Sequence, residues 1–265
     1  MMFLWKTKPN FRIVYIMMLY VRRPYGNLYS IFANVSVNYP WSIDFGHPEN
    51  EGLPGTRNFY VETERDVKVG VWHILPQSLI DSAPVDESEK EEWYEKSLSD
   101  HRPVILYFHG NTASRAVAHR IELYNVLRKM EYHVVAFDYR GYADSTPIPP
   151  NETYVVHDAK VVYRYIRQRI GSSPFFVWGH SLGTGVSSHA VGDLCLEGEH
   201  PAALVLESPF NNIRDEIKFH PLSSLTLLVC LTLNAPYGLK YFSWNEIVFL
   251  PLSEIIRLYK GTVVQ

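Results

Sequence analysis

Cysteine is scarce in this sequence, because Cys195 and Cys230 are the only two cysteines among 265 residues. Two residues cannot build a disulfide framework, and their separation does not match the spacing of metal ligands. We therefore expect both to be small apolar residues in the interior of the protein. We expect no metal site and no cofactor.

An excess of charge of either sign is also missing. The formal net charge is −3, and charged residues make up 20% of the chain. No basic field that would attract nucleic acid is present, so we expect no nucleic-acid partner. Internal repeats and low-complexity tracts are absent as well. A hydrophobic content of 46% in a chain of this length is typical of one sizeable globular domain.

No apolar run is long enough to cross a membrane as a helix. Residues 11–21 read FRIVYIMMLYV, and Arg22 and Arg23 follow them, whereas a spanning helix needs about 20 apolar residues. A signal peptide is disfavoured because no small-residue cleavage site follows. Two alternatives stay open, an interfacial or re-entrant segment and a helix packed on the domain's own surface. We assign residues 1–57 as an apolar N-terminal segment and linker, a candidate for membrane association.

From residue 58 onward the pattern is that of a folded domain. Alternating side chains over 58–75 predict a β-hairpin, and the charged stretch 82–100 predicts a solvated loop with one short helix around 89–96. Four apolar runs then alternate with three helical stretches: the runs are 104–108, 133–137, 175–178 and 203–206, and the stretches are 118–130, 151–169 and 182–196. This alternation predicts an α/β fold, a mostly parallel sheet with helices on both faces.

Polar or glycine residues follow each of the four apolar runs. The sequences at these points are HGN, DYRG, GHSLG and ESP. Ligands of parallel α/β sheets bind outside the carboxyl ends of the strands. The chemistry of this protein is therefore expected at that edge of the sheet.

The segment GHSLG, residues 179–183, fits the G-x-S-x-G nucleophile elbow, with an apolar strand before it and a helix after it. In such an elbow a sharp strand-to-helix turn exposes the serine hydroxyl, so we predict that Ser181 is a catalytic nucleophile. The backbone N–H of Leu182, at the start of the helix, would donate to the oxyanion formed by attack on a carbonyl. The second oxyanion donor is expected in the loop after the first parallel strand, where the N–H of Asn111 is the best candidate. His109 is expected to be structural.

Four stretches resemble the lysophosphatidylserine lipase and monoacylglycerol lipase group of α/β-hydrolase-domain proteins: LYFHGNTASRAVAHRIELY, HVVAFDYRGYADS, VWGHSLGTGV and LESPFNNIRDEIKFHP. The similarity extends from about residue 58 to about residue 221. It implies a membrane-associated serine hydrolase whose domain faces the lumen of the endoplasmic reticulum and which cleaves an acyl ester of a lysophospholipid or monoacylglycerol. It also implies that Ser181 is the nucleophile and that Asn111 and Leu182 are the oxyanion donors. The sequons at Asn34 and Asn151 agree with a luminal position.

An acid and a base for Ser181 are hard to find. In this fold they follow the serine in the order acid, then histidine. After residue 210 the sequence offers only one aspartate, Asp215, and one histidine, His220. Their five-residue separation places them on different faces of a helix. Glu207 lies at a strand end but would still need a histidine, so Glu207 and His220 remain weak candidates.

The resemblance ends near residue 221, and the following 222–265 segment contains no Asp or His at all. We therefore expect a partial α/β-hydrolase core over 58–221, with the C-terminal part of the fold missing or replaced by a divergent apolar tail over 222–265. Three alternatives follow: a lipid ester hydrolase with little or no activity, an inactive hydrolase-like protein that binds lipid or a partner, and an unstable truncated product.

Overall fold

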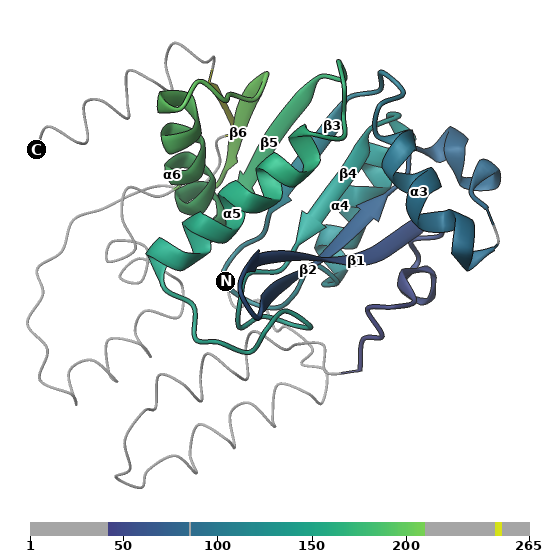
Figure 1. The fold of residues 1–265 in the computed structure, drawn as a ribbon, viewed down its shortest axis with the longest axis horizontal. Helices are drawn as coiled ribbons and strands as arrows, with labels where there is room; N and C mark the ends of the chain where they lie inside the picture. The colour runs from purple at the N-terminus through teal and green to yellow at the C-terminus, as the bar shows by residue number, and fades with distance from the viewer. Residues whose placement is uncertain (1–41, 85, 210–246, 251–265) are drawn as a thin grey trace, which may run out of the picture.

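A seven-stranded sheet forms the centre of the protein, with the strand order β1-β2-β4-β3-β5-β6-β7 (Figure 1). The computed structural model describes residues 42–84, 86–209 and 247–250. Residues 1–41 of the N-terminal segment, His220 and all of the tail except 247–250 lie outside these residues. The strands are β1 (Thr56–Glu64), β2 (Val67–Ile74), β3 (Val104–Phe108), β4 (His133–Phe137), β5 (Phe175–His180), β6 (Ala203–Glu207) and β7 (Ile247–Leu250).

The middle of the sheet is parallel, as the sequence predicts. β4 and β5 each pair in parallel with β3, and β6 pairs in parallel with β5. The predicted hairpin is also present, since β1 pairs antiparallel with β2, and β2 joins the parallel strands through an antiparallel pairing with β4. The carboxyl ends of β3, β4, β5 and β6 therefore share one edge of the sheet.

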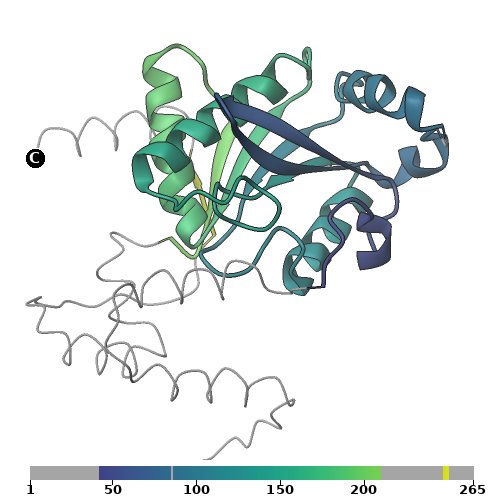
Figure 2. The same ribbon diagram turned by 60° about the horizontal axis from the view of Figure 1, so that its bottom comes forward.

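Helices cover both faces of the sheet (Figures 1 and 2). The helices are α3 (Glu87–Ser97), α4 (Ala118–Lys129), α5 (Glu152–Arg167) and α6 (Leu182–Leu196), with short 3-10 turns η1 (Pro48–Glu51) and η2 (Gln77–Ser82). α4 packs on one face against alternate residues such as Ile105 and Tyr107. α5 and α6 pack on the other face, against Leu106 and Phe108. The central strands are apolar throughout because both of their faces are buried.

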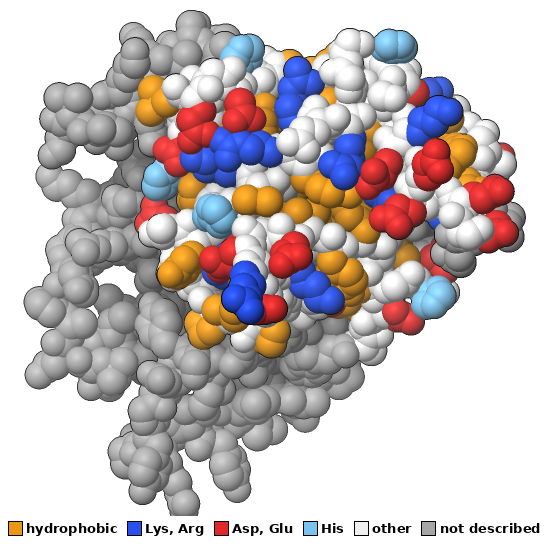
Figure 3. Space-filling view, viewed as in Figure 1, with side chains coloured by type: hydrophobic (Ala, Val, Ile, Leu, Met, Phe, Trp, Pro, Cys, Tyr) orange, Lys and Arg blue, Asp and Glu red, His pale blue; other side chains and the backbone are white. Residues whose placement is uncertain are grey.

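Ion pairs join α5 to the residues that directly follow α6. Lys160 contacts Glu197 at 2.7 Å, and Arg164 contacts Glu199 at the same distance. Figure 3 shows basic and acidic side chains interspersed on this face. The pairs are partly exposed, so each is expected to contribute less than about 1 kcal/mol.

The described residues of the tail, 247–250, form one strand of the sheet. β7 pairs antiparallel with β6, with residue 247 opposite Glu207 and residue 250 opposite Leu204. This pairing ends the parallel run of strands on that side. Within the described ranges, no helix has the length and apolar character needed to cross a membrane.

A buried pair of histidines lies between β2 and β4. Nε2 of His73 is 2.9 Å from Nδ1 of His133, and Nε2 of His133 is 3.3 Å from a carboxylate oxygen of Asp100. Neither imidazole is exposed to solvent. Burial is the main cause that holds the pKa of His73 well below its ordinary value, and the nearby His133 and Arg57 lower the pKa further. The folded protein therefore keeps His73 neutral.

This pair should make the fold sensitive to acid. The unfolded chain takes up a proton on His73 below about pH 6.5, whereas the folded chain does not. The contribution of the neutral His73 to the free energy of unfolding should therefore be complete above that pH. Below it, the free energy of unfolding should fall as the pH decreases, by up to about 1.4 kcal/mol per pH unit. Urea denaturation at several pH values measures this slope. In His73→Gln, which keeps a hydrogen-bonding group toward His133 but does not titrate, the slope should be shallower; equal slopes would contradict the prediction.

Candidate active site

Ser181 occupies the turn between β5 and α6 and has a backbone conformation that few L-residues adopt. Its φ is 49° and its ψ is −117°. The turn is held on both sides, because the N–H of Ser181 donates to the carbonyl of Glu207 at 2.9 Å and the N–H of Thr184 donates to the carbonyl of Ser181 at 2.8 Å. A non-glycine residue in such a conformation costs about 1–3 kcal/mol and persists only where the surrounding structure imposes it.

The two glycines of the segment allow α6 to approach the sheet closely. A Cβ on Gly179 would lie 2.4 Å from Oγ of Ser187 and 2.5 Å from the carbonyl oxygen of Gly183. A Cβ on Gly183 would lie 2.1 Å from the carbonyl oxygen of Phe108, at the end of β3. Only glycine fits at either position, so the G-x-S-x-G pattern here reflects a packing requirement. The strand–turn–helix context predicted for the elbow is present.

The loop after β3 lies beside Ser181. A Cβ built on Gly110 would be 3.4 Å from Cβ of Ser181 and 3.1 Å from Nδ1 of His180. The side chain of Asn111 accepts a hydrogen bond from the Tyr142 hydroxyl at 3.1 Å. The structure thus brings the predicted loop to the nucleophile. Leu182 is the first residue of α6, and the donor roles of Asn111 and Leu182 stay predictions.

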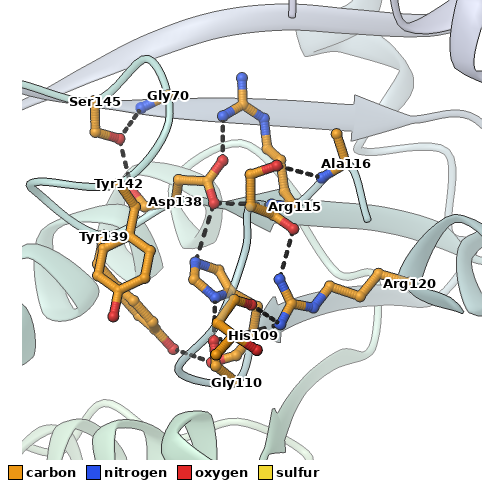
Figure 4. A network of polar contacts seen from close by, with 12 residues as sticks. Gly70, His109, Gly110, Arg115, Ala116, Arg120, Asp138, Tyr139, Tyr142 and Ser145 are labelled. Atoms are coloured by element: carbon orange, nitrogen blue, oxygen red, sulfur yellow. Dashed lines mark hydrogen bonds and ion pairs between the residues drawn. The ribbon is translucent and has the colours of Figure 1, made fainter. Parts of the chain in front are cut away.

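His109 is fully buried and belongs to a polar network beneath this loop (Figure 4). Its Nδ1 lies 2.7 Å from the Gly110 carbonyl oxygen and therefore carries the proton, because a carbonyl only accepts. Its Nε2 is 3.1 Å from a carboxylate oxygen of Asp138. Burial lowers the pKa of His109, although Asp138 favours the protonated form. These contacts agree with a structural role for His109.

Asp138 connects the network to Arg115. It accepts hydrogen bonds from the backbone N–H of Arg115 at 2.8 Å and from its Nη1 at 2.5 Å. Arg115 also contacts Asp144 at 2.6 Å. Burial by itself would raise the pKa of Asp138, but the charge of Arg115 and the hydrogen bonds from it outweigh this effect, and the pKa is lowered. The carboxylate of Asp138 thus holds the loop after β3 and the loop after β4 together at the carboxyl edge of the sheet.

Of the two weak candidates, only Glu207 lies among the described residues, and no hydrogen bond joins its carboxylate to the hydroxyl of Ser181. The carboxylate of Glu207, at the end of β6, accepts a hydrogen bond from Nε1 of Trp178 at 3.0 Å. His220 and Asp215 lie outside the described residues. Within the described part of the chain, no side chain accepts a hydrogen bond from the Ser181 hydroxyl.

Two histidines near the nucleophile were not identified from the sequence. The rings of His119 and His180 lie 6.2 Å apart, and Nδ1 of His180 is buried without a hydrogen-bond partner among the described residues. Burial lowers the pKa of His180, and the carboxylate of Glu207 offsets this only in part. For His180, the only indication in the sequence was its position within the GHSLG motif. Nothing in the sequence indicated that His119, in α4, would lie near His180.

Comparisons with known proteins identify the class of this domain. A family model described as the alpha/beta hydrolase fold matches residues 103–227. The crystal structure of an alpha-beta hydrolase from Vibrio vulnificus superposes with a TM-score of 0.50 over 96% of this chain and 73% of that chain, at 15% sequence identity, which shows the fold alone. The domain has the α/β-hydrolase fold.

Comparison with curated proteins identifies a more specific group of similar proteins. The chain is 47% identical over 193 residues to lysophosphatidylserine lipase ABHD12 of Danio rerio and 48% identical over the same length to that of Xenopus tropicalis, with 73% of this chain and 49% of each relative covered. It is 40% identical over 176 residues to human protein ABHD12B, covering 66% of this chain and 47% of that protein. The resemblance to the lysophosphatidylserine lipase group is therefore confirmed. The chain spans about half the length of the curated relatives that it matches.

Proposed function

We propose that this chain carries the nucleophile of a serine ester hydrolase of the lysophospholipase or monoacylglycerol lipase type. The observation that carries the proposal is the conformation of Ser181, with φ at 49° in a strand-to-helix turn that only glycines on either side permit. The substrate class follows from the similar proteins, which are named lysophosphatidylserine lipases. A lipid ester, presented at a membrane surface, is the proposed substrate.

The proposed reaction has two halves. Oγ of Ser181 attacks the acyl carbonyl carbon, and the carbonyl oxygen becomes an oxyanion that accepts hydrogen bonds from the backbone N–H groups of Leu182 and Asn111. Collapse breaks the ester bond, releases the alcohol and leaves an acyl group on Ser181. Water then attacks the acyl group, so a fatty acid leaves and the serine is restored. The partial positive charge at the start of α6 favours both oxyanions.

The proposed reaction also needs a base and an acid. A serine hydroxyl is a weak nucleophile without a base, and the base in turn needs an acid to orient it. Glu207 and His220 are the residues of this chain to test first. An inactive hydrolase-like protein that binds lipid or a partner is the second candidate, because no described side chain accepts the Ser181 proton.

Labelling with a fluorophosphonate probe tests the proposed nucleophile. The probe should modify Ser181 of the full chain slowly, and Ser181→Ala should abolish the modification while shifting the free energy of unfolding by less than about 0.5 kcal/mol. Mass spectrometry of the digested protein locates the modified residue. Equal labelling of Ser181→Ala would place the nucleophile elsewhere.

The strain at the turn can be measured independently of chemistry. Glycine adopts positive φ without steric cost. Ser181→Gly should therefore be more stable than Ser181→Ala by about 1 kcal/mol in thermal or urea unfolding. A less stable glycine variant would show that the turn is not strained at this residue.

We propose that the domain lies at the luminal face of the endoplasmic reticulum membrane. Asn151 supports this, because it is an exposed sequon residue whose Oδ1 caps α5 by accepting the N–H of Tyr154 at 3.0 Å, leaving Nδ2 to carry a glycan. Expression with microsomes followed by glycosidase treatment tests the proposal. The unaltered chain should shift in mobility, and the variant lacking both Asn34 and Asn151 should not. An unshifted chain that is also digested by added protease would contradict a luminal position.

A further inference from the structure

One buried arginine donates hydrogen bonds to several carbonyl groups of the loop after β3, beside Ser181. Arg120, in the first turn of α4, is 2% exposed. Its Nη1 donates to the carbonyl of Ser114 at 2.5 Å, and its Nη2 donates to the carbonyls of Thr112 at 2.8 Å and Gly110 at 3.3 Å. Figure 4 shows the guanidinium of Arg120 pointing into this loop. Three carbonyl groups of one short loop thus converge on a single cation.

The hydrogen bond from Arg120 to the carbonyl of Gly110 determines the direction of the backbone N–H of Asn111. A peptide unit is planar and trans, so its C=O and the N–H of the following residue point in opposite directions. The carbonyl of Gly110 points inward, to Nη2 of Arg120 and to Nδ1 of His109 at 2.7 Å. The N–H of Asn111 must therefore point away from these groups. Within the described residues no hydrogen bond takes up this N–H, so it is free to receive a ligand.

We propose that Arg120, together with His109, is a positioning residue that holds the peptide between Gly110 and Asn111 in the orientation of an oxyanion donor. The proposal rests on the proposed function, in which this N–H stabilises the oxyanion. A neutral side chain at position 120 would leave three carbonyl groups without their shared donor. The peptide could then rotate, and its carbonyl oxygen would repel an oxyanion that the N–H should stabilise.

Arg128 offers a matched control. It lies on the same helix, is 1% exposed, and its guanidinium donates to the carbonyl of Pro54 in a different loop. Replacing either arginine by methionine removes a buried cation from α4 and leaves one or more carbonyl groups unpaired. Both variants should lose stability. Only Arg120→Met should disturb the loop beside Ser181.

The test combines probe kinetics with hydrogen–deuterium exchange on the full chain. Labelling of Ser181 by a fluorophosphonate is measured over a range of concentrations, which separates the maximal rate from the half-saturating concentration. Arg120→Met should lower the maximal rate on the order of 10²-fold, the effect of losing one oxyanion donor, and leave the half-saturating concentration unchanged. Arg120→Lys should recover part of the rate, because an ammonium supplies donors without the planar fork. Arg128→Met should retain the rate.

Exchange locates the disturbance without depending on chemistry. Arg120→Met should speed exchange in residues 110–114, and Arg128→Met should speed it in residues 52–56 instead. Labelling of Arg120→Met at the rate of Arg128→Met would overturn the proposal. If Ser181 of the unaltered chain takes up no probe, the proposed nucleophile fails, and exchange alone then decides: unchanged exchange of residues 110–114 in Arg120→Met would overturn the positioning role.

Discussion

Residues 1–265 should hydrolyse lysophosphatidylserine and monoacylglycerol about 10⁴ to 10⁶ times more slowly than the Danio rerio relative, the loss typical of removing triad members. The proposed nucleophile, Ser181, has the strained strand-to-helix turn expected of an elbow. Within the described residues, no side chain accepts a hydrogen bond from its hydroxyl. The 222–265 segment contains neither Asp nor His.

Some catalysis should remain, because an oxyanion hole and substrate binding alone retain roughly 10³ to 10⁴ over the reaction in water. The experiment compares microsomes that contain the full chain with microsomes that contain Ser181→Ala, using both lipids as substrates. The two should release fatty acid at nearly the same rate. Activity at the level of the relative would contradict the prediction and would indicate an unrecognised base. Glu207→Gln and His220→Gln would then be the variants to measure first.

The elements of this fold could be predicted because each has a local cause in the sequence. β3 and β4 begin and end at the limits of their apolar runs, 104–108 and 133–137. α6 begins directly after Ser181, as the G-x-S-x-G pattern requires. The short helix expected in the charged segment is present as α3, which begins slightly earlier because Asp86 caps it by accepting the N–H of Ser88 at 2.9 Å.

The arrangement of the site could be predicted only in part. Sequence motifs located Ser181 and the loop after β3, because backbone turns leave glycine signatures. Long side chains leave no such signature, so nothing indicated that Arg120 of α4 would bind three carbonyl groups of that loop. The contact between His73 and His133 likewise depends on the pairing of β2 with β4, since their 60-residue separation in sequence carries no local pattern.

The strand β7 at the edge of the sheet was also not predicted from the sequence. The sequence indicated that the segment 222–265 is a divergent apolar tail, without indicating a strand within it. Among the described residues of the tail, 247–250 form the strand β7, which pairs antiparallel with β6. Four apolar residues form a pattern too short to distinguish a strand from other buried segments. Pairing with an open edge decides the outcome, because unpaired backbone groups of an edge strand readily accept another strand.

Gly183→Ala should be the most damaging single substitution in the elbow. A Cβ at this position would lie 2.1 Å from the carbonyl oxygen and 2.6 Å from the carbonyl carbon of Phe108, and 3.0 Å from the carbonyl oxygen of His109. These are backbone atoms of β3 and its loop, so relief requires α6 to move away from the sheet. Overpacking typically costs about 1–3 kcal/mol, and we expect the upper end of this range because the clash is with backbone atoms. The better helix propensity of alanine returns only about 0.5–1 kcal/mol.

Thermal unfolding and probe labelling together measure this effect. The net loss should lower the Tm by about 5–10 °C and should also suppress labelling of Ser181, because the shift of α6 displaces the N–H of Leu182. Gly198→Ala is the control, since Gly198 follows the same helix, has a φ of 83° and has no atom within 4 Å of a built Cβ. That variant carries only the cost of left-handed backbone, about 1–2 kcal/mol, and should keep full labelling. If Gly183→Ala melts no lower than Gly198→Ala and labels equally well, the contact between α6 and β3 does not hold the elbow in place.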